Sequence, residues 1–405
     1  MTDTAPHSPP AGVADLLTAD VPDLLAAEVG VGARVMVVGE LRLRGGTAPG
    51  SAQATAKVAE AVDAWSGPGV LVFNGGLLDQ GSDTADAVAA HPGLVRSVAR
   101  FASGPGRRVV VLPGETDAFL AWDAAARAQL AGRLGAEFAL ALELHMATAD
   151  GPRTVRVEPG GRLDPLSARR DPRNPLETPL SWHLREEMLA NVRRREPSDS
   201  TSAGWLAGLE QLDDPGAWPR FFASRLTYRR LAPHSWLLLL PFAAALVLGV
   251  PAEVWRRAHG GLAGVDRAGL LVAATVVELV VLAALAVVSL RRTWDSLANA
   301  TLGQERRDLN QGARSAARQL VTAGYAGLVT SHTSRAQLVS LGSGFFANTG
   351  AAGDVVTELP SRLASLGLPA VFGAFRQVGW VELEAGAVVH ARLVFGRRPA
   401  GGATV

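Results

Sequence analysis

Polar side chains that could bind a cation or an anion follow several short apolar runs of the chain. Glu40 and Arg42 come directly after residues 34–38, and Glu115 and His332 each follow a similar run further along. Carboxylates and imidazoles bind divalent cations, and a pair of cations about 3.5–4 Å apart can clamp a phosphate and activate a hydroxide. Arginine instead pairs with carboxylates or with anions. These residue types indicate either a metal-dependent hydrolytic site or a charged binding site.

The apolar runs that carry these residues are predicted to be buried strands of an α/β domain. Residues 34–38, 70–73 and 108–112 are rich in Val and Leu, and each ends at a polar or Gly-containing turn. The helices expected between and after these strands lie at residues 52–65, 84–90, 94–103 and 117–134. Strands that alternate with helices predict a layered α/β architecture.

Further strands, some of them antiparallel, are expected in the remainder of the domain. Asp150-Gly151 separates two apolar runs and is a hairpin signal. Residues 328–330 and 337–341 flank the polar turn at residues 331–335, and residues 351–396 have the pattern of further antiparallel strands. The carboxy-terminal part is therefore predicted to complete a sheet.

Composition excludes several classes of protein. The net charge of +1 over 405 residues provides no electrostatic basis for binding nucleic acid. The absence of cysteine excludes disulfides, thiolate metal sites and cysteine nucleophiles. Hydrophobic residues make up 48% and charged residues only 19%, which is apolar for a purely soluble protein.

Two long apolar segments account for part of this composition. Residues 235–255 and 268–290 each have about the 20 residues that a membrane-spanning helix needs. Trp236, Trp255 and Trp294 lie near their ends, where aromatic side chains prefer the membrane interface. We predict a transmembrane helical hairpin, and a buried helical hairpin of a soluble core is the alternative.

Arginines predict the orientation of this hairpin. They are more frequent before the first segment and after the second than in the loop at residues 256–267, so both flanks are expected to be cytoplasmic. The expected location is the cell membrane, with two spans and with cytoplasmic amino- and carboxy-terminal parts. Glu278, the only ionisable residue of the second segment, is expected to serve helix packing or oligomerisation. The sequence leaves the oligomeric state open.

The turns after the strands resemble, in order, the motifs of calcineurin-like metallophosphoesterases. In that family the motifs run GDxH, GDxxDR, GNH[DE], a later histidine, and GHTH. The corresponding stretches here are GELR at residues 39–42, GGLLDQ at 75–80, GETD at 114–117, VEPG at 157–160 and SHTS at 331–334. The resemblance covers residues 34–350 and implies a sandwich of two β-sheets flanked by helices, interrupted by the transmembrane hairpin.

Most of the family's metal ligands are replaced in this chain. Carried over position by position, the degenerate site comprises Glu40, Arg42, Gly76, Asp79, Glu115, Thr116, Asp117, His332 and Ser334. Gly76 stands for the aspartate that bridges the metals, and Arg42 stands for a histidine ligand. Only His332 matches a ligand position, whereas Asp79 and Asp117 match acidic positions that mainly brace the site.

These replacements favour binding over catalysis. Two cations without a bridging carboxylate would repel each other, and Arg42 adds a further positive charge. We therefore expect a pseudo-phosphoesterase that binds a partner or acts as a scaffold at the cytoplasmic membrane face, and no cofactor. The alternative is an active phosphoester hydrolase with an altered or single-metal site, in which Glu40, Glu115 and His332 hold one Mn, Fe or Zn ion.

The partner of the vacated site is expected to be a phosphate-bearing ligand or a protein. Arg42, Arg44 and Arg335 are the candidates for binding an anion, together with backbone N–H groups of the glycine turns. A simpler alternative for Arg42 is an ion pair with Glu40 or Glu115.

The expected organisation has four parts. They are a flexible leader and short helix at residues 1–30, the first part of the phosphoesterase-like domain at 31–230, the transmembrane hairpin at 231–292, and the second part of the domain with the terminal strands at 293–405.

Overall fold

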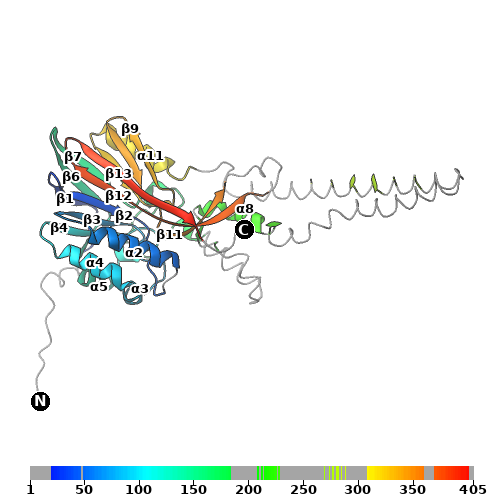
Figure 1. Cartoon of the computed structure of the whole chain (residues 1–405), viewed down its shortest axis with the longest axis horizontal. Helices are drawn as coiled ribbons and strands as arrows, with labels where there is room; N and C mark the ends of the chain where they lie inside the picture. The colour runs from blue at the N-terminus through cyan, green and yellow to red at the C-terminus, as the bar shows by residue number, and fades with distance from the viewer. Residues whose placement is uncertain are drawn as a thin grey trace, which may run out of the picture.

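Two facing β-sheets with helices on their outer sides form the body of the protein (Figure 1). The computed structural model describes residues 20–46, 49–183, 211–212, 214–225, 227–228, 308–359 and 369–400, with residue 208 and eight positions between 269 and 288. Within these residues, the predicted α/β sandwich of two sheets is confirmed.

The first sheet has seven strands among the described residues. Its order is β11 (Gly353–Leu359), β12 (Val371–Ala385), β2 (Arg34–Val38), β3 (Gly69–Asn74), β4 (Arg107–Leu112) and β5 (Ala136–Phe138), and β13 (Val389–Pro399) also pairs with β12. Strands β2 to β5 are parallel to one another. The long strand β12 runs antiparallel to β2, β11 and β13. The carboxyl ends of β2, β3 and β4 therefore lie at one edge of the sheet.

The second sheet has six strands among the described residues. Its order is β1 (Leu25–Val29), β6 (Leu142–Thr148), β7 (Gly151–Val157), β8 (Gly327–Thr330), β10 (Gly344–Asn348) and β9 (Gln337–Leu341). The pair β7 and β8 is parallel, which brings the turn after Val157 beside the turn after Thr330.

Helices cover the outer face of each sheet (Figure 1). The first sheet carries α2 (Pro49–Asp63), α3 (Thr84–Ala90), α4 (Pro92–Ala102), the 3-10 turn η1 (Ala118–Ala121) and α5 (Ala124–Leu134). The second sheet carries α11 (Gln311–Thr322). Smaller elements are the 3-10 turns η2 (Gly161–Leu163) and η4 (Pro215–Ala217), and helix α8 (Trp218–Arg225), which packs on β12.

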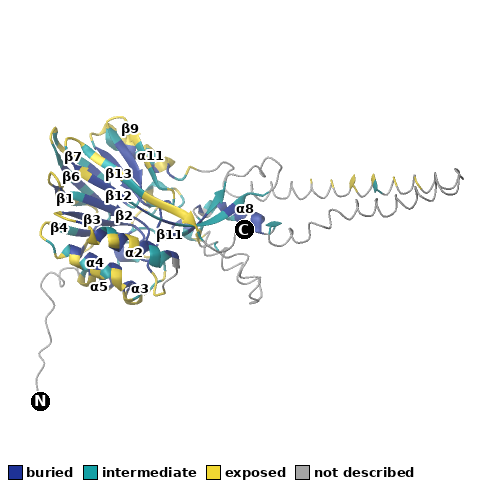
Figure 2. Ribbon diagram, viewed as in Figure 1, coloured by how far each residue is buried: buried dark blue, intermediate teal, exposed yellow. Residues whose placement is uncertain are grey.

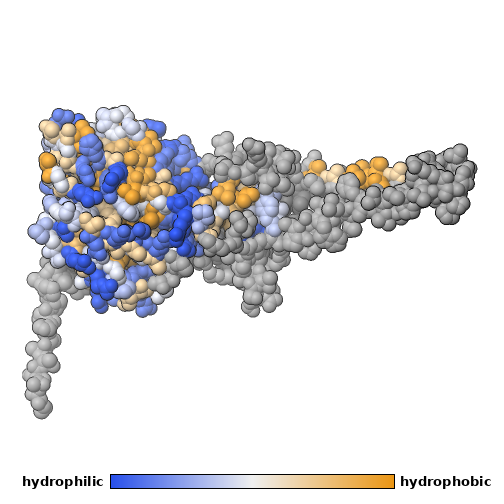
Figure 3. Space-filling model, viewed as in Figure 1, coloured by the Kyte–Doolittle hydropathy of each residue, from blue (hydrophilic) through white to orange (hydrophobic). Residues whose placement is uncertain are grey.

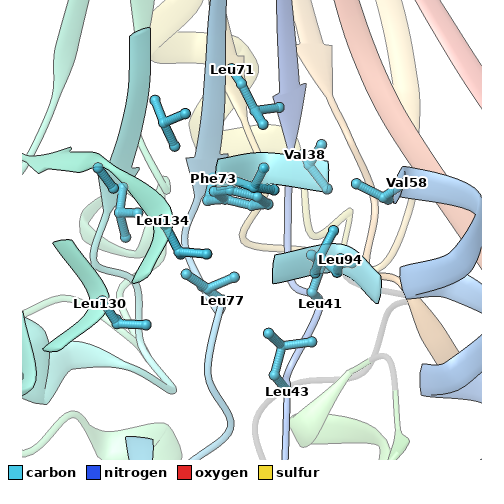
Figure 4. Close-up of a cluster of buried hydrophobic side chains, with 14 of the residues drawn as sticks. Val38, Leu41, Leu43, Val58, Leu71, Phe73, Leu77, Leu94, Leu130 and Leu134 are labelled. Carbon is cyan, nitrogen blue, oxygen red and sulfur yellow. The ribbon is translucent and has the colours of Figure 1, made fainter. Parts of the chain in front are cut away.

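Alternation along each central strand divides the core into two layers. In β3, Leu71 and Phe73 face the helices while Val70 and Val72 face the other sheet. Figure 4 shows the helix-side layer, in which Phe73 lies among leucines and valines of the strands and helices. In Figure 2 the two sheets are mostly buried, and the end of β13 is exposed. Burial on both faces explains why these parallel strands are continuous apolar runs.

One sequence prediction of helix is wrong, and another is confirmed only in part. Residues 25–29, predicted as part of a helix, form β1, because Ala27 and Val29 alternate with exposed residues and the segment pairs with β6. The single helix predicted at residues 117–134 is divided into η1 and α5. Asp123 caps the second piece by accepting a hydrogen bond from the Ala126 N–H at 3.0 Å.

Several predictions fall outside the described part of the chain. The leader at residues 1–19, the segment at 235–255 and most of the segment at 268–290 lie there. Among the residues that the structure does describe, no helix has both the length and the apolar character needed to cross a membrane.

Candidate functional site

The turns after β2, β3 and β4 form one connected surface at the edge of the first sheet. The Glu40 N–H donates to the Gly75 carbonyl at 2.9 Å, and the Arg42 N–H donates to the Gly76 carbonyl at 2.8 Å. These bonds prolong the pairing of β2 with β3 beyond the ends of the regular strands. The Gly76 N–H also donates to Asp117 Oδ1 at 3.0 Å, so three of the turns that resemble phosphoesterase motifs are in direct contact.

The turns of the second sheet close over the same place. The Ser331 hydroxyl donates to the Asn74 carbonyl at the end of β3, and the Ser331 N–H donates to the Pro159 carbonyl at 3.1 Å. A Cβ atom added to Gly39 would overlap with Ser331, so the two sheets approach closely here and a glycine is required. All five turns, at residues 39–42, 75–80, 114–117, 157–160 and 331–334, are thus brought together.

Alternation in the turn after β2 presents two charged side chains to the site. Leu41 and Leu43 are buried in the helix-side core, where Figure 4 shows them below Val38. Glu40 and Arg42 point away from that core and line a cleft. Burial of the two leucines therefore positions the charged pair.

The cleft has a volume of about 170 Å³. It is lined by residues of the predicted site, namely Glu40, Arg42, Arg44, Glu115, Thr116, His332 and Ser334. Gln211, Leu212 and Asp214 line it from one side of the undescribed segment at residues 229–268, and Leu309 lines it from beyond the second apolar segment. The cleft is therefore lined by residues from both sides, in sequence, of the central apolar region.

Glu40 and Arg42 form an ion pair within the cleft. Arg42 Nη2 lies 2.6 Å from Glu40 Oε2, with 32% of the arginine side chain exposed and 9% of the glutamate side chain. Both residues have positive φ, 43° for Glu40 and 49° for Arg42, which is rare for residues other than glycine. The pKa of Arg42 is raised, first by the charge of Glu40 against the opposing effect of burial, and further by Asp79 and Glu115.

Asp79, Asp117 and Thr116 brace the turns. Asp79 forms an ion pair with Arg44. Asp117 is fully buried and accepts hydrogen bonds from the N–H groups of Gly114, Gly76 and Leu77 at 2.7, 3.0 and 2.8 Å. Burial raises the pKa of Asp117, and these backbone donors oppose that rise. Thr116 donates to the Leu78 carbonyl at 3.1 Å.

His332 lies between two carboxylates. Its Nε2 is 3.3 Å from Asp164 Oδ2, and its Nδ1 is 3.9 Å from Glu115 Oε2. Burial alone would lower the pKa of His332, but the hydrogen bond to Asp164 and the charges of Glu115, Glu40 and Asp164 outweigh burial and raise it. The neighbouring carboxylates therefore favour the charged form of the His332 ring.

The three arginines proposed for anion binding do not converge. Arg42 and Arg44 line the cleft, but each is paired with a carboxylate. Arg335 is exposed and lines a different hollow, together with Thr357, Glu358 and other residues near β11 and β12. An anion in the cleft would therefore have to compete with Glu40 and Asp79 for the two guanidinium groups.

The residues at the site do not fit a two-metal centre. Gly76 provides no carboxylate at the bridging position, and its φ of 61° suits glycine. Glu40 is engaged by Arg42, and Glu115 accepts a hydrogen bond from the Ser181 hydroxyl at 2.7 Å. Within the described ranges, no group of three or more His, Asp and Glu side chains is arranged to hold a metal ion.

Two site residues were missed by the sequence analysis. Asp164 and Ser181 come from the Pro- and Arg-rich stretch at residues 161–183 and contact His332 and Glu115. This stretch has little regular structure, and neither residue is part of a recognisable motif. Only the folding of this stretch over the cleft reveals them.

Comparisons with known proteins identify no family for the chain. No protein-family model matches it, and no curated protein matches it. A solved structure of a single mutant of Vps29 from Entamoeba histolytica is 11% identical, and the alignment covers 90% of this chain and 99% of that one. The TM-score of 0.25 is too low for this likeness to carry an argument about fold or function.

Proposed function

We propose that the chain is a membrane-anchored protein with a calcineurin-like phosphoesterase fold, whose degenerate site binds a partner instead of hydrolysing a phosphoester. The observation that carries this proposal is that the five motif-like turns meet, that three of them (residues 39–42, 114–117 and 331–334) line one cleft, and that other residue types stand at the positions of the metal ligands. Glu40 is paired with Arg42 at 2.6 Å, and Gly76 has no side chain. A cleft built by such turns but without a ligand set favours recognition over turnover.

The partner of the cleft is proposed to be a protein. A phosphate group would need free guanidinium groups, and Arg42 and Arg44 are already paired with Glu40 and Asp79. A protein segment can instead use a polar group that lines the cleft, such as the hydroxyl of Ser334. At about 170 Å³ the cleft suits one or two side chains rather than a whole nucleotide.

The membrane anchor is proposed to be the region of residues 231–292, with both domain parts cytoplasmic. The described positions of its second segment include a set of exposed Ala and Val residues in helical conformation: Ala273, Val277, Val280, Val281, Ala284 and Val288. Their spacing places them on one side of a helix. Figure 3 shows hydrophobic surface along this stretch, and lipid is the environment that such a surface prefers.

Metal content and turnover together test the loss of catalysis. The purified full-length protein, assayed with an aryl phosphate and Mn²⁺, should show no turnover above that of the His332→Ala variant and no stoichiometric metal. Turnover that depends on Mn²⁺ and disappears in His332→Ala would instead establish the altered-site hydrolase.

Two further measurements test the partner and the anchor. Inorganic phosphate and nucleotides should not raise the melting temperature of the wild type. A clear rise that is lost in Arg42→Ala would indicate a phosphate-bearing ligand in place of the protein partner.

Reporters fused at both termini should be cytoplasmic, and a reporter in the loop at residues 256–267 should be on the opposite side of the membrane. A cytoplasmic loop would contradict the anchor.

A further inference from the structure

A second hollow adjoins the cleft. It has a volume of about 230 Å³ and is lined by Ser334, Arg335, Val355, Thr357, Glu358, Gln377 and Arg397. Ser334 and Val355 also line the cleft, so the two hollows share a border. A protein segment that occupies the cleft could therefore continue into the second hollow.

The pairing of the strands places polar and cationic side chains of the second hollow on one face of the first sheet. Gln377 of β12 is paired with Arg397 of β13 on one side and with Gly353 of β11 on the other. Paired residues share a face of a sheet, and so does every second residue along a strand. Arg397 and Gln377 therefore lie on the same face as Val355 and Thr357 of β11.

The carboxylate among the residues that line this hollow belongs to the opposite face. Glu358 is paired with Phe372, whose ring packs edge-on against Phe221 of α8 with 5.3 Å between the centroids. On that side of the sheet, Glu358 Oε2 lies 3.5 Å from Arg220 Nε. The described lining thus carries two arginines and one carboxylate, and a cation of α8 already accompanies the carboxylate.

Packing on the sheet positions the Arg397 guanidinium. Its Cζ lies 3.8 Å from the centroid of the Phe375 ring. A guanidinium group stacked in this way directs its N–H groups sideways, within its own plane. The ring has room because residue 373 is glycine, where an added Cβ would lie 2.9 Å from Phe375 Cε2. Ordering this side chain in advance lowers the entropic cost of binding.

The backbone of Arg335 is fixed beside the same face. Its carbonyl accepts hydrogen bonds from Asn310 Nδ2 at 3.1 Å and from Asn348 Nδ2 at 3.0 Å. The Ser334 carbonyl accepts from Gln377 Nε2 at 2.8 Å, and Gln377 is buried. The turn at residues 334–335 is therefore held on the first sheet, and the exposed arginine side chain extends from a fixed point.

We infer that the second hollow binds a carboxylate of an acidic segment of the protein partner, between the guanidinium groups of Arg335 and Arg397. Guanidinium groups match carboxylates in shape and charge. The carboxylate that lines this hollow, Glu358, would repel a doubly charged phosphate more strongly than a singly charged carboxylate. This inference rests on the proposed function, in which a protein occupies the cleft.

The cleft itself is a poor place for an acidic side chain. It is lined by five carboxylates, those of Glu40, Glu115, Asp164, Asp214 and Asp354. Like charges repel, so an acidic residue of a bound segment favours the second hollow over the cleft. Charge thus fixes the direction in which the segment crosses the border between the two hollows.

A labelled hexaglutamate peptide tests the inference on the purified full-length protein in a non-ionic detergent. Fluorescence anisotropy measures its affinity, and hexaglutamine serves as the uncharged peptide. The wild type should bind hexaglutamate at least tenfold more tightly than hexaglutamine. Arg335→Gln and Arg397→Gln should each weaken binding about threefold and the double variant about tenfold, as expected for exposed ion pairs.

Arg398→Gln is the matched control. Arg398 is the next residue of β13 and is exposed like Arg397, but it lies on the opposite face and donates a hydrogen bond to Gln53. Its replacement removes the same charge and should leave the affinity for hexaglutamate unchanged. Equal affinity of the double variant and Arg398→Gln would overturn the inference, because binding would then reflect general charge.

A lipid phosphate is the other anion that the experiment can detect. If hexaglutamate binds the wild type no better than hexaglutamine, the acidic segment is overturned. Soluble dihexanoyl phosphatidylglycerol that binds the wild type but not the double variant would then assign the second hollow to a lipid headgroup.

Failure of the inference and failure of the proposed function give different results. Metal-dependent turnover by the wild type would remove the proposed function and, with it, the partner segment. An inactive wild type whose affinity for hexaglutamate does not depend on Arg335 and Arg397 would remove only the acidic segment.

Discussion

Replacing Asp117 by alanine should destabilise the protein more than any other single carboxylate change in the turns. The side chain is fully buried and accepts three backbone hydrogen bonds, from Gly114, Gly76 and Leu77, at 2.7, 3.0 and 2.8 Å. These bonds join the turn after β3 to the turn after β4. In Asp117→Ala all three donors would lose their acceptor within the protein interior.

The expected loss follows from the cost of unsatisfied donors. A buried N–H group without an acceptor costs about 1–3 kcal/mol, so three such groups, some of which reach water by relaxation, give about 3–6 kcal/mol. The free energy of unfolding of a whole domain is only about 5–15 kcal/mol. Asp117→Asn, which keeps one acceptor oxygen, should lose an intermediate amount.

Urea unfolding of the full-length protein, followed by tryptophan fluorescence, measures this loss. Asp123→Ala is the matched control, because Asp123 is exposed and accepts a single backbone hydrogen bond, from Ala126 at 3.0 Å. Loss of that helix cap should cost about 1 kcal/mol. If Asp117→Ala is destabilised no more than Asp123→Ala, the three hydrogen bonds do not hold the turns together as described.

Two further predictions concern His332 and Gly76. In an NMR titration, the pKa of His332 should exceed about 6.5. It should fall in Asp164→Asn, because the hydrogen bond between His332 Nε2 and Asp164 Oδ2 favours the charged ring. The stabilisation of the folded state by the charged His332 ring should be complete below about pH 6.5 and disappear as the pH rises through the pKa of His332 in the folded state. A His332 pKa that Asp164→Asn leaves unchanged would contradict this role of Asp164. Gly76→Ala should lower the free energy of unfolding by about 1–3 kcal/mol, since φ is 61° and the added Cβ presses on Glu40. The control Gly81→Ala shares a positive φ but has open space around it, so an equal loss in both variants would argue against crowding at Gly76.

Local pattern in the sequence was sufficient for most of the strands. The predictions at residues 34–38, 70–73 and 108–112 agree with β2, β3 and β4 to within a residue at each end, because buried parallel strands are uninterrupted apolar runs. The hairpin at Asp150-Gly151 is likewise present as β6 and β7. The segment at residues 25–29 was misjudged because five residues carry too little periodicity, and only pairing with β6 makes them a strand.

The candidate site could likewise be predicted from the sequence only in part. The order of the motif-like turns, and the replacement of ligand types by Arg42, Gly76 and Thr116, could be read directly from the residues. The sequence left two partners open for Arg42, namely Glu40 and Glu115. In the structure, Arg42 Nη2 lies 2.6 Å from Glu40 Oε2. The choice required knowing that Leu41 is buried, because its burial turns both neighbours toward the cleft.

The sequence by itself thus determined which strands end in polar turns and which side chains those turns have lost, since both properties are local. Tertiary structure alone decided that Asp164 and Ser181 reach His332 and Glu115, and that Arg335 lies outside the cleft. The physical reason is that these contacts join residues far apart in the chain. Their positions depend on how whole sheets and loops pack, and local sequence periodicity does not predict that packing.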